Sequence, residues 1–218
     1  MKKSLLVGAA LASLVLVAPE ASAGTYKPYV SVFGGAAFLS HNPHINSTGA
    51  NTYDLLINNP GYIIGGTVGV DWGNQLRTEL ELSHARWGSD RYHVYCDCDG
   101  SIYDGTSSVS ATYLLGNAWY DLNHGARVTP YVGGGLGIGW ANVHAGIDGG
   151  PVDFNATGLA FQVGAGIRFN VSDRVAIDAG YRFKDIVGLN YSSNVSEYTL
   201  TDTSLASHNF QIGLIFQF

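Results

Sequence analysis

Residues 207–218 read SHNFQIGLIFQF, and this stretch decides how the rest of the chain is interpreted. From Phe210 onward, every second position holds a large apolar side chain: Phe210, Ile212, Leu214, Phe216 and Phe218. Gln211, Gly213 and Gln217 lie between them. Because successive side chains of a strand point to opposite faces, the stretch predicts a strand with one apolar face and one polar face.

The same period-2 alternation recurs along the chain in segments of about 9–14 residues, and a tilted strand needs about 9–11 residues to cross a bilayer. We therefore predict an all-β fold, an eight-stranded antiparallel transmembrane up-and-down β-barrel. The predicted strands are Tyr29–Phe38, Tyr62–Trp72, Leu76–Trp87, Val109–Leu122, Pro130–Trp140, Leu159–Phe169, Val175–Phe183 and Ser207–Phe218.

The connections between these segments alternate between short and long. Residues 73–75, 123–129 and 170–174 are short and turn-like, whereas 40–61, 88–108, 141–158 and 184–206 are long and polar. Outer-membrane barrels have this asymmetry, with short periplasmic turns and longer extracellular loops. The pattern therefore predicts short periplasmic turns and four long extracellular loops.

Charged residues occur at the polar positions of the alternation. A charge on the lipid face near the bilayer midplane costs about 2–4 kcal/mol for Arg or Lys, so these rows must face inward, in a barrel that is polar inside and apolar outside. The predicted lumen charge network consists of Asp71, Arg77, Glu79, Glu81, Asp121, Arg168, Asp178, Arg182 and Lys184.

An eight-stranded barrel is just wide enough inside to be filled by side chains, and buried charges need partners. We therefore expect Glu79 and Glu81 to pair with Arg182, Lys184 or Arg168, forming a plug that closes the lumen. A gated or ion-selective pathway past these groups is the alternative. Inward glycines leave room beside the large charged side chains, and both the plug and the pathway are compatible with this space. These glycines are Gly133, Gly135, Gly137, Gly139, Gly164 and Gly166.

Aromatic residues gather near both ends of the predicted strands, as in the two interfacial girdles of membrane proteins. The predicted periplasmic girdle contains Tyr29, Trp72, Tyr120, Tyr131, Phe169 and Phe218. The predicted extracellular girdle contains Phe38, Tyr62, Trp87, Trp140, Phe161, Phe183 and Phe210.

The first residues have the features of an export signal. Lys2 and Lys3 precede an apolar run from Leu5 to Val17, and Ala21-Ser22-Ala23 is a small-residue cleavage site. We therefore predict a signal peptide over residues 1–23, cleaved near Ala23, and one barrel domain over residues 24–218. A net charge of −6 disfavours a nucleic-acid partner, which would need a basic surface, and no cofactor is predicted.

Three stretches resemble a known family: Pro130–Gly137 (PYVGGGLG), Asp173–Phe183 (DRVAIDAGYRF) and Phe210–Phe218 (FQIGLIFQF). They resemble the porin-family surface antigens built on an OmpA/OmpX-like barrel, including those of rhizobia, brucellae and rickettsiae. The resemblance implies a location in the outer membrane of a Gram-negative bacterium. It also implies that Phe218 is the residue recognised by the barrel-assembly machinery. The peptidoglycan-binding domain of full OmpA has no counterpart in this sequence, so cell-wall tethering is not implied.

Ser83 and His84 suggest a hydrolase, but adjacent strand residues point to opposite faces, whereas a nucleophile and its base must be in hydrogen-bond reach. We find no triad of residues at the barrel rim and predict that the protein is not an enzyme.

The loop at 97–104 (DCDGSIYD) has alternating carboxylates but lacks the closing Glu of an EF-hand loop. A softer metal site is the alternative, formed by Cys96, Cys98 and His93, or by His41 and His44. No ligand spacing requires either site, so we predict a solvated acidic loop without a metal. Cys96 and Cys98 form either a strained local disulfide or two free thiols.

Two functions remain. The first is a structural and surface barrel with a side-chain-filled lumen, which contributes to envelope integrity and presents loops for surface interactions. The alternative is a small-solute diffusion porin, although roomy channels have 16–18 strands. The expected partners are outer-membrane lipid and lipopolysaccharide, the barrel-assembly machinery, and host surface molecules that contact the loops.

Overall fold

The computed structural model describes residues 26–47, 52–57, 60–95, 101–147, 150–195, 198–200 and 202–218. The predicted signal peptide, Cys96 and Cys98 lie outside the described residues. Within the described ranges, no helix is both long and apolar enough to cross a membrane.

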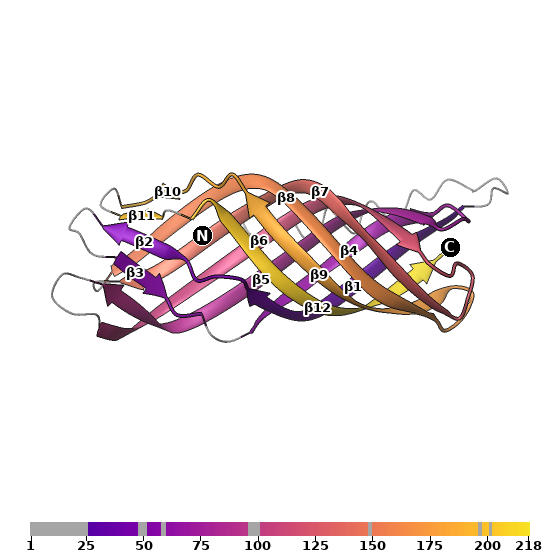
Figure 1. Ribbon diagram of the computed structural model, residues 1–218, viewed down its shortest axis with the longest axis horizontal. Helices are drawn as coiled ribbons and strands as arrows, with labels where there is room; N and C mark the ends of the chain where they lie inside the picture. Colours follow the sequence, from indigo (N-terminus) through magenta and orange to yellow (C-terminus); the bar gives the residue numbers. More distant parts are fainter. Residues whose placement is uncertain are drawn as a thin grey trace, which may run out of the picture.

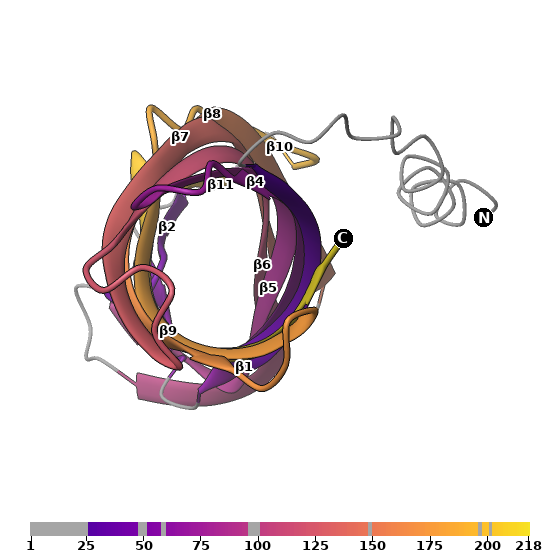
Figure 2. The same ribbon diagram turned by 90° about the vertical axis from the view of Figure 1, so that its right-hand side faces the viewer.

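Eight long antiparallel strands form a closed barrel, which confirms the predicted fold class (Figures 1 and 2). Each strand pairs with the next along the chain, and the first, β1, pairs with the last, β12, so that the ring has no open edge. The barrel strands are β1 (Lys27–Leu39), β4 (Gly61–Asp71), β5 (Leu76–Tyr95), β6 (Ser101–Asp121), β7 (Val128–Ile147), β8 (Gly150–Asn170), β9 (Val175–Val187) and β12 (Ser204–Gln217).

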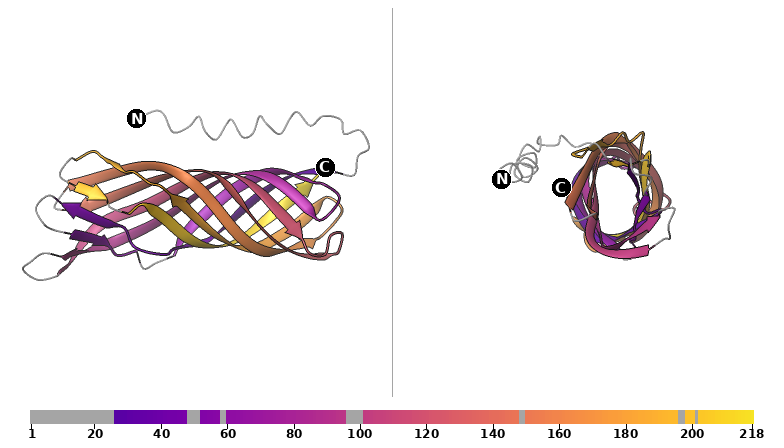
Figure 3. Two further views of the ribbon diagram at one scale, coloured as in Figure 1. Left: turned by 45° about the horizontal axis from the view of Figure 1, so that its top comes forward. Right: turned by 90° about the vertical axis from the view of Figure 1, so that its left-hand side faces the viewer.

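Short turns join the strands at one end, which we call the periplasmic end because short turns face the periplasm in such barrels. They occupy residues 72–75, 122–127 and 171–174. Gly73 and Gly125 have φ of 71° and 80°, a conformation that glycine adopts without steric cost. Phe218 lies at this end as well, away from the short strands of the other end (Figures 1 and 3).

The opposite, extracellular end contains more regular structure than the sequence indicates. β5 to β8 are 20 or 21 residues long, so two hairpins occupy much of the segments expected as loops at 88–108 and 141–158. The other two long connections contain short strands: β2 (His44–Ser47), β3 (Thr52–Leu55), β10 (Ser192–Ser193) and β11 (Tyr198–Leu200). β2 and β3 pair with each other, β3 also with β5, and β11 with β2.

The outer wall of the barrel is apolar around its whole circumference, as lipid contact requires. Each barrel strand contributes at least one large exposed apolar residue, for example Val32, Ile64, Leu80, Leu114, Leu136, Val163, Ile177 and Ile212. Most aromatic residues expected in the girdles are on this face. Trp72, Tyr120, Phe169 and Phe218 are exposed near the periplasmic end, and Phe38, Tyr62, Trp140 and Phe210 are exposed further up.

Three aromatic residues expected in the girdles instead point into the barrel. Tyr29 and Tyr131 are each 2% exposed, and Trp87 is fully buried. Trp87 donates from Nε1 to the Ala37 carbonyl oxygen at 2.9 Å. The girdle assignment of these three was wrong because closeness to a strand end does not determine which face a side chain occupies, whereas strand parity does.

The interior has two zones, which corrects the expectation of a lumen that is polar throughout. The periplasmic half contains the charged rows, whereas the extracellular half is an apolar core. The long strands and the short strands β2, β3 and β11 continue the sheet at this end, and apolar side chains fill the upper interior. The core includes Ile45, Tyr53, Leu55, Ile63, Trp87, Tyr113, Leu115, Val143, Phe154, Ile186 and Leu205.

Candidate functional site in the barrel lumen

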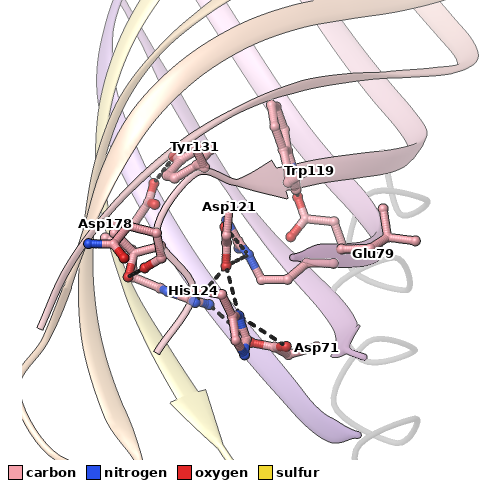
Figure 4. Close-up of polar contacts among 12 residues, drawn as sticks. Asp71, Glu79, Trp119, Asp121, His124, Tyr131 and Asp178 are labelled. Atoms are coloured by element: carbon pink, nitrogen blue, oxygen red, sulfur yellow. Dashed lines mark hydrogen bonds and ion pairs between the residues drawn. The ribbon is translucent and has the colours of Figure 1, made fainter. Parts of the chain in front are cut away.

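The charges nearest the periplasmic end form a cluster of two aspartates and two arginines. Arg77 Nε lies 3.0 Å from Asp121 Oδ1, and Arg168 donates from its terminal nitrogens to Asp121 Oδ2 at 2.7 Å and to Asp71 Oδ2 at 3.4 Å. These side chains come from β4, β5, β6 and β8, which converge on one point of the lumen (Figure 4). All four are at most 3% exposed, so the pairing of opposite charges is what makes their burial tolerable.

His124, from the turn after β6, lies beside this cluster. Its Nδ1 is 3.7 Å from Asp121 Oδ2 and 4.0 Å from Asp71 Oδ1 (Figure 4). In the described part of the chain, Asp71, Asp121 and His124 are the group whose ligand atoms all lie within 4.8 Å of one another. Arg77 and Arg168 already neutralise the two carboxylates, so a cation bound there would be repelled by two guanidinium groups, and we assign no metal to this cluster.

The next level of the lumen is organised by Arg182 and Tyr131. The Tyr131 hydroxyl accepts from Arg182 at 2.7 Å and donates to Asp178 Oδ1 at 2.8 Å. The Arg182 guanidinium also lies 4.1 Å from the ring centroid of Trp119. The indole Nε1 of Trp119 in turn donates to Glu79 Oε1 at 2.8 Å. Arg182 and Asp178 also form an ion pair at 3.9 Å, and Trp119 links the Arg182 level to Glu79, with which Arg182 forms no ion pair.

Glu79 is held mainly by neutral donors. Tyr29 donates to Glu79 Oε2 at 2.8 Å, and Asn117 donates to Oε1 at 3.1 Å, in addition to Trp119. No described residue forms an ion pair with Glu79, so the expected partner cations do not contact this carboxylate.

Glu81 and Lys184 form the innermost ion pair. Lys184 Nζ lies 2.5 Å from Glu81 Oε1, and Lys184 has no exposed surface. Glu81 also accepts from Ser83 at 2.7 Å, from Gln162 at 2.7 Å and from Asn117 at 3.0 Å. Four donors therefore surround one buried carboxylate, which compensates for much of its lost hydration.

Large inward side chains fit because glycine occupies neighbouring inward positions. A Cβ atom added at Gly164 would lie 2.6 Å from Arg182 Cδ, and one added at Gly133 would lie 2.6 Å from the Trp119 ring. Both distances are shorter than van der Waals contact allows. The glycine rows seen in the sequence therefore make room for filling side chains.

Two cavities of different size lie along the lumen. A vestibule of about 470 Å³ opens at the periplasmic end, and His124, Arg168 and Lys27 are among its lining residues. Between Glu81, Arg182 and Trp119, only about 30 Å³ remains, which is space for one or two water molecules. The apolar core lies beyond Glu81 and Lys184.

All nine charged residues assigned to the lumen from the sequence lie in the barrel interior. The structure places Glu81 against Lys184, places Arg168 with aspartates instead of a glutamate, and leaves Glu79 with neutral partners. The polar lumen residues that sequence reasoning missed are Tyr29, Ser83, Asn117, Trp119, His124 and Tyr131. Strand parity would have found most of them, since Tyr131 has the parity of Gly133 and Gly135.

Ser83 and His84 are separated as the sequence predicts. Ser83 points inward to Glu81, whereas His84 points outward and its Nδ1 lies 2.9 Å from the Thr112 hydroxyl. Within the described residues, His41, His44 and His93 do not form a group of three close metal ligands. The cysteine alternatives lie outside the described residues.

A closed antiparallel barrel with an apolar outer wall, aromatic residues near both ends and paired charges inside defines a transmembrane β-barrel of the outer-membrane type. The sequence agrees with this class. The family described as "outer membrane protein beta-barrel domain" matches residues 8–218, so the chain belongs to this family.

Individual relatives with low sequence identity match part of the chain. The outer membrane protein PagN of Salmonella typhimurium is 28% identical over 125 residues, which are 51% of this chain and 52% of PagN. An uncharacterized protein of Brucella abortus is 25% identical over 163 residues, 63% of this chain and 56% of that protein. The alignments thus span about half the length of these curated relatives.

Among solved structures, Neisserial surface protein A has a TM-score of 0.53 and 19% identity, over 91% of this chain and 100% of that one. At this level of identity, the likeness shows the fold alone.

Proposed function

We propose that this protein is a sealed outer-membrane barrel that contributes to envelope integrity and presents its extracellular hairpins and loops for surface interactions. It is exported by a signal peptide that is cleaved near Ala23. In this proposal the nine lumen charges have a structural role, since they fill and close the periplasmic half of the barrel.

The observation that carries the proposal is that the lumen is blocked twice in succession. The first block is the polar level around Glu81 and Arg182, where the remaining cavity is about 30 Å³. The second block is the apolar core, where Trp87, Tyr113 and Ile186 are fully buried. A hydrated ion that passed the first block would have to lose its water to enter the second, which is costly in an apolar environment.

The proposed partners follow from the outer surface. The apolar wall and its aromatic residues fit outer-membrane lipid and lipopolysaccharide. The extracellular hairpins and loops rest on a rigid barrel, which is the usual arrangement for recognition of other molecules, and host surface molecules are the partners that we propose for them. The barrel-assembly machinery is the proposed partner of Phe218.

A small-solute diffusion porin is the alternative, and the vestibule of about 470 Å³ is the feature that favours it. A channel would need a continuous aqueous path, so the vestibule would have to connect to the outside through a rearranged core.

Single-channel recording in a planar bilayer separates the two functions. The refolded chain, residues 24–218, should give no stable conductance, with heat-modifiable migration as the proof that the barrel is folded and vesicle flotation as the proof that it is inserted. A reproducible conductance step from the folded barrel would contradict sealing and favour the porin. An established porin of 16 strands is the positive control for the same bilayers.

A further inference from the structure

A serine, a histidine and an aspartate lie in one row across three neighbouring strands of the extracellular end. Ser108 of β6 is the register partner of His144 of β7, and His144 is the register partner of Asp153 of β8. Register partners in antiparallel strands point to the same face, with Cβ atoms about 4.5–5.5 Å apart. The three residues therefore lie side by side in the order serine, histidine, aspartate, although Ser108 and Asp153 are 45 positions apart in the chain.

The contact between the histidine and the aspartate matches the base–aspartate half of a catalytic triad, whereas the register places Ser108 beside His144 without a hydrogen bond between these two described residues. His144 Nδ1 lies 2.6 Å from Asp153 Oδ1. In a Ser-His-Asp triad, the aspartate holds Nδ1 and so leaves Nε2 free to take the serine proton. Both side chains are about half exposed, 48% for His144 and 49% for Asp153, so a dissolved molecule can reach them.

The row borders a hollow on the outer wall. The hollow has a volume of about 340 Å³, and its lining includes Ser108, His144, Asp153, Ser110, Asn142 and Asn155. On the other side of Ser108, the register partner in β5 is Gly88, and a Cβ atom added there would meet nothing within 4 Å. Space for a reacting molecule therefore exists on both sides of the Ser108 hydroxyl.

The position along the strands places the row outside the hydrocarbon layer. Trp140, an exposed aromatic residue of the outer wall, lies four residues before His144 on β7, which is about 13 Å along a strand at 3.3 Å per residue. The polar lining agrees with this level. The half-exposed side chains of His144 and Asp153 agree with a water-facing site.

We propose that Ser108, His144 and Asp153 form a hydrolytic site for short-chain carboxylic esters, with Ser108 as nucleophile, His144 as general base and Asp153 as positioning residue. The Ser108 oxygen bonds to the ester carbonyl carbon while its proton passes to His144 Nε2. The bond from that carbon to the alcohol oxygen then breaks, and the leaving alcohol takes the proton from His144. Water, activated by His144, hydrolyses the acyl-serine and releases the carboxylic acid.

The tetrahedral oxyanion of this reaction needs a hydrogen-bond donor. Asn142 lies on the same outward face of β7, two residues from His144, and is among the residues that line the hollow. It is the donor that we assign to this role.

The proposal goes beyond the sealed-barrel function and departs from the expectation that the protein is not an enzyme, which rested on finding no triad at the rim of the barrel. Cross-strand register assembles one that sequence neighbours did not reveal.

Labelling with a fluorophosphonate probe tests the site without knowledge of the natural ester. The folded barrel should be labelled on Ser108, and Ser108→Ala should abolish labelling. Ser40→Ala is the control, because Ser40 is an exposed serine at the extracellular end that does not line the hollow; this variant should remain labelled. Absence of labelling in a heat-modifiable, folded wild-type barrel, or labelling that survives in Ser108→Ala, would overturn the proposal.

Hydrolysis of p-nitrophenyl acetate and p-nitrophenyl decanoate measures the reaction itself. We expect hydrolysis of the acetate ester over the decanoate ester, with loss of activity in Ser108→Ala and His144→Gln. His44→Gln removes another exposed histidine that contacts an aspartate, Asp54, and should leave hydrolysis unchanged. Asp153→Asn should lower the rate and shift its pH profile, which a structural role of the aspartate would not do. Equal rates in wild type and Ser108→Ala would contradict the assignment.

Discussion

Lys184 illustrates how a single residue can be buried in this barrel only because of its partners. Its ammonium group contacts Glu81 and lies 5.1 Å from the ring centroid of Tyr113. Tyr113 belongs to the apolar core, so Lys184 marks the boundary between the two interior zones. Removal of one member of such a pair leaves a buried charge without compensation, which is more costly than removal of both members.

Replacement of Lys184 by Ala should therefore lower the free energy of unfolding by about 3–5 kcal/mol, the range for breaking a buried ion pair. The measurement is equilibrium urea unfolding in lipid vesicles. Lys27→Ala is the control, because Lys27 is exposed at the barrel mouth, and its effect should stay within about 0.5 kcal/mol. The double variant Glu81→Gln with Lys184→Met should be less destabilised than Lys184→Ala. Equal unfolding midpoints for wild type and Lys184→Ala would refute the pairing argument.

At the scale of the element, β12 closes the barrel. It pairs with β9 on one side and with β1 on the other over residues 207–217. The chain beyond it is also fixed, since the Phe218 amide donates to the Pro28 carbonyl oxygen at 3.0 Å. The Phe218 side chain is 68% exposed on the outer wall and hence free to contact another protein before the barrel inserts.

If Phe218 is the residue that the assembly machinery recognises, Phe218→Ser should lower the amount of barrel in the outer membrane severalfold. Its unfolding midpoint once folded should be almost unchanged, because an exposed side chain contributes little to stability. Phe210→Ser is the matched control, an exposed phenylalanine further up the same strand, and should assemble normally. Quantitative blotting of membrane fractions decides, and normal amounts of the Phe218→Ser barrel would count against the proposed role.

At the scale of the whole molecule, the two interior zones act in series. The polar zone excludes apolar solutes because its groups are already paired, and the apolar zone excludes ions because it offers no hydration. In the proposed sealed barrel, either zone is enough to keep the lumen closed, so we expect that the loss of one zone will not be visible in conductance.

Conductance of single and combined variants tests this arrangement. Glu81→Ala with Lys184→Ala widens the polar zone, and Trp87→Ala widens the apolar zone, and each change alone should leave the bilayer silent. The combination of all three should produce measurable conductance. As the control, Trp140→Ala replaces Trp87→Ala in the triple combination. Trp140 points outward, so this control combination should give no conductance. Conductance from the polar-zone variant alone would show that the apolar core does not seal the barrel.

Much of the fold could be predicted from local pattern. The period-2 alternation determines which residues of β9 and β12 face lipid, and charges are excluded from the lipid face by several kcal/mol each, so the inward position of Arg182 and Lys184 was readable from the sequence. The same parity rule places Tyr131 and Trp87 inside the barrel. Their assignment to the girdles rested on nearness to a strand end, which does not determine the face. The extension of β5 to β8 beyond the membrane was harder to predict. Its outward residues face water and are polar, so the composition of these segments resembles that of loops.

The sequence by itself determined the strand number, the lipid-facing surface and the set of charges inside the barrel, because these depend on periodicity and on the cost of burying charge. Only the tertiary structure decided which charges meet, where the polar zone gives way to the apolar core, and that Ser108, His144 and Asp153 share a row. The physical reason is that these contacts join residues 9 to 103 positions apart in the chain. Their pairing is set by the cross-strand register and by closure of the barrel, which no local pattern encodes.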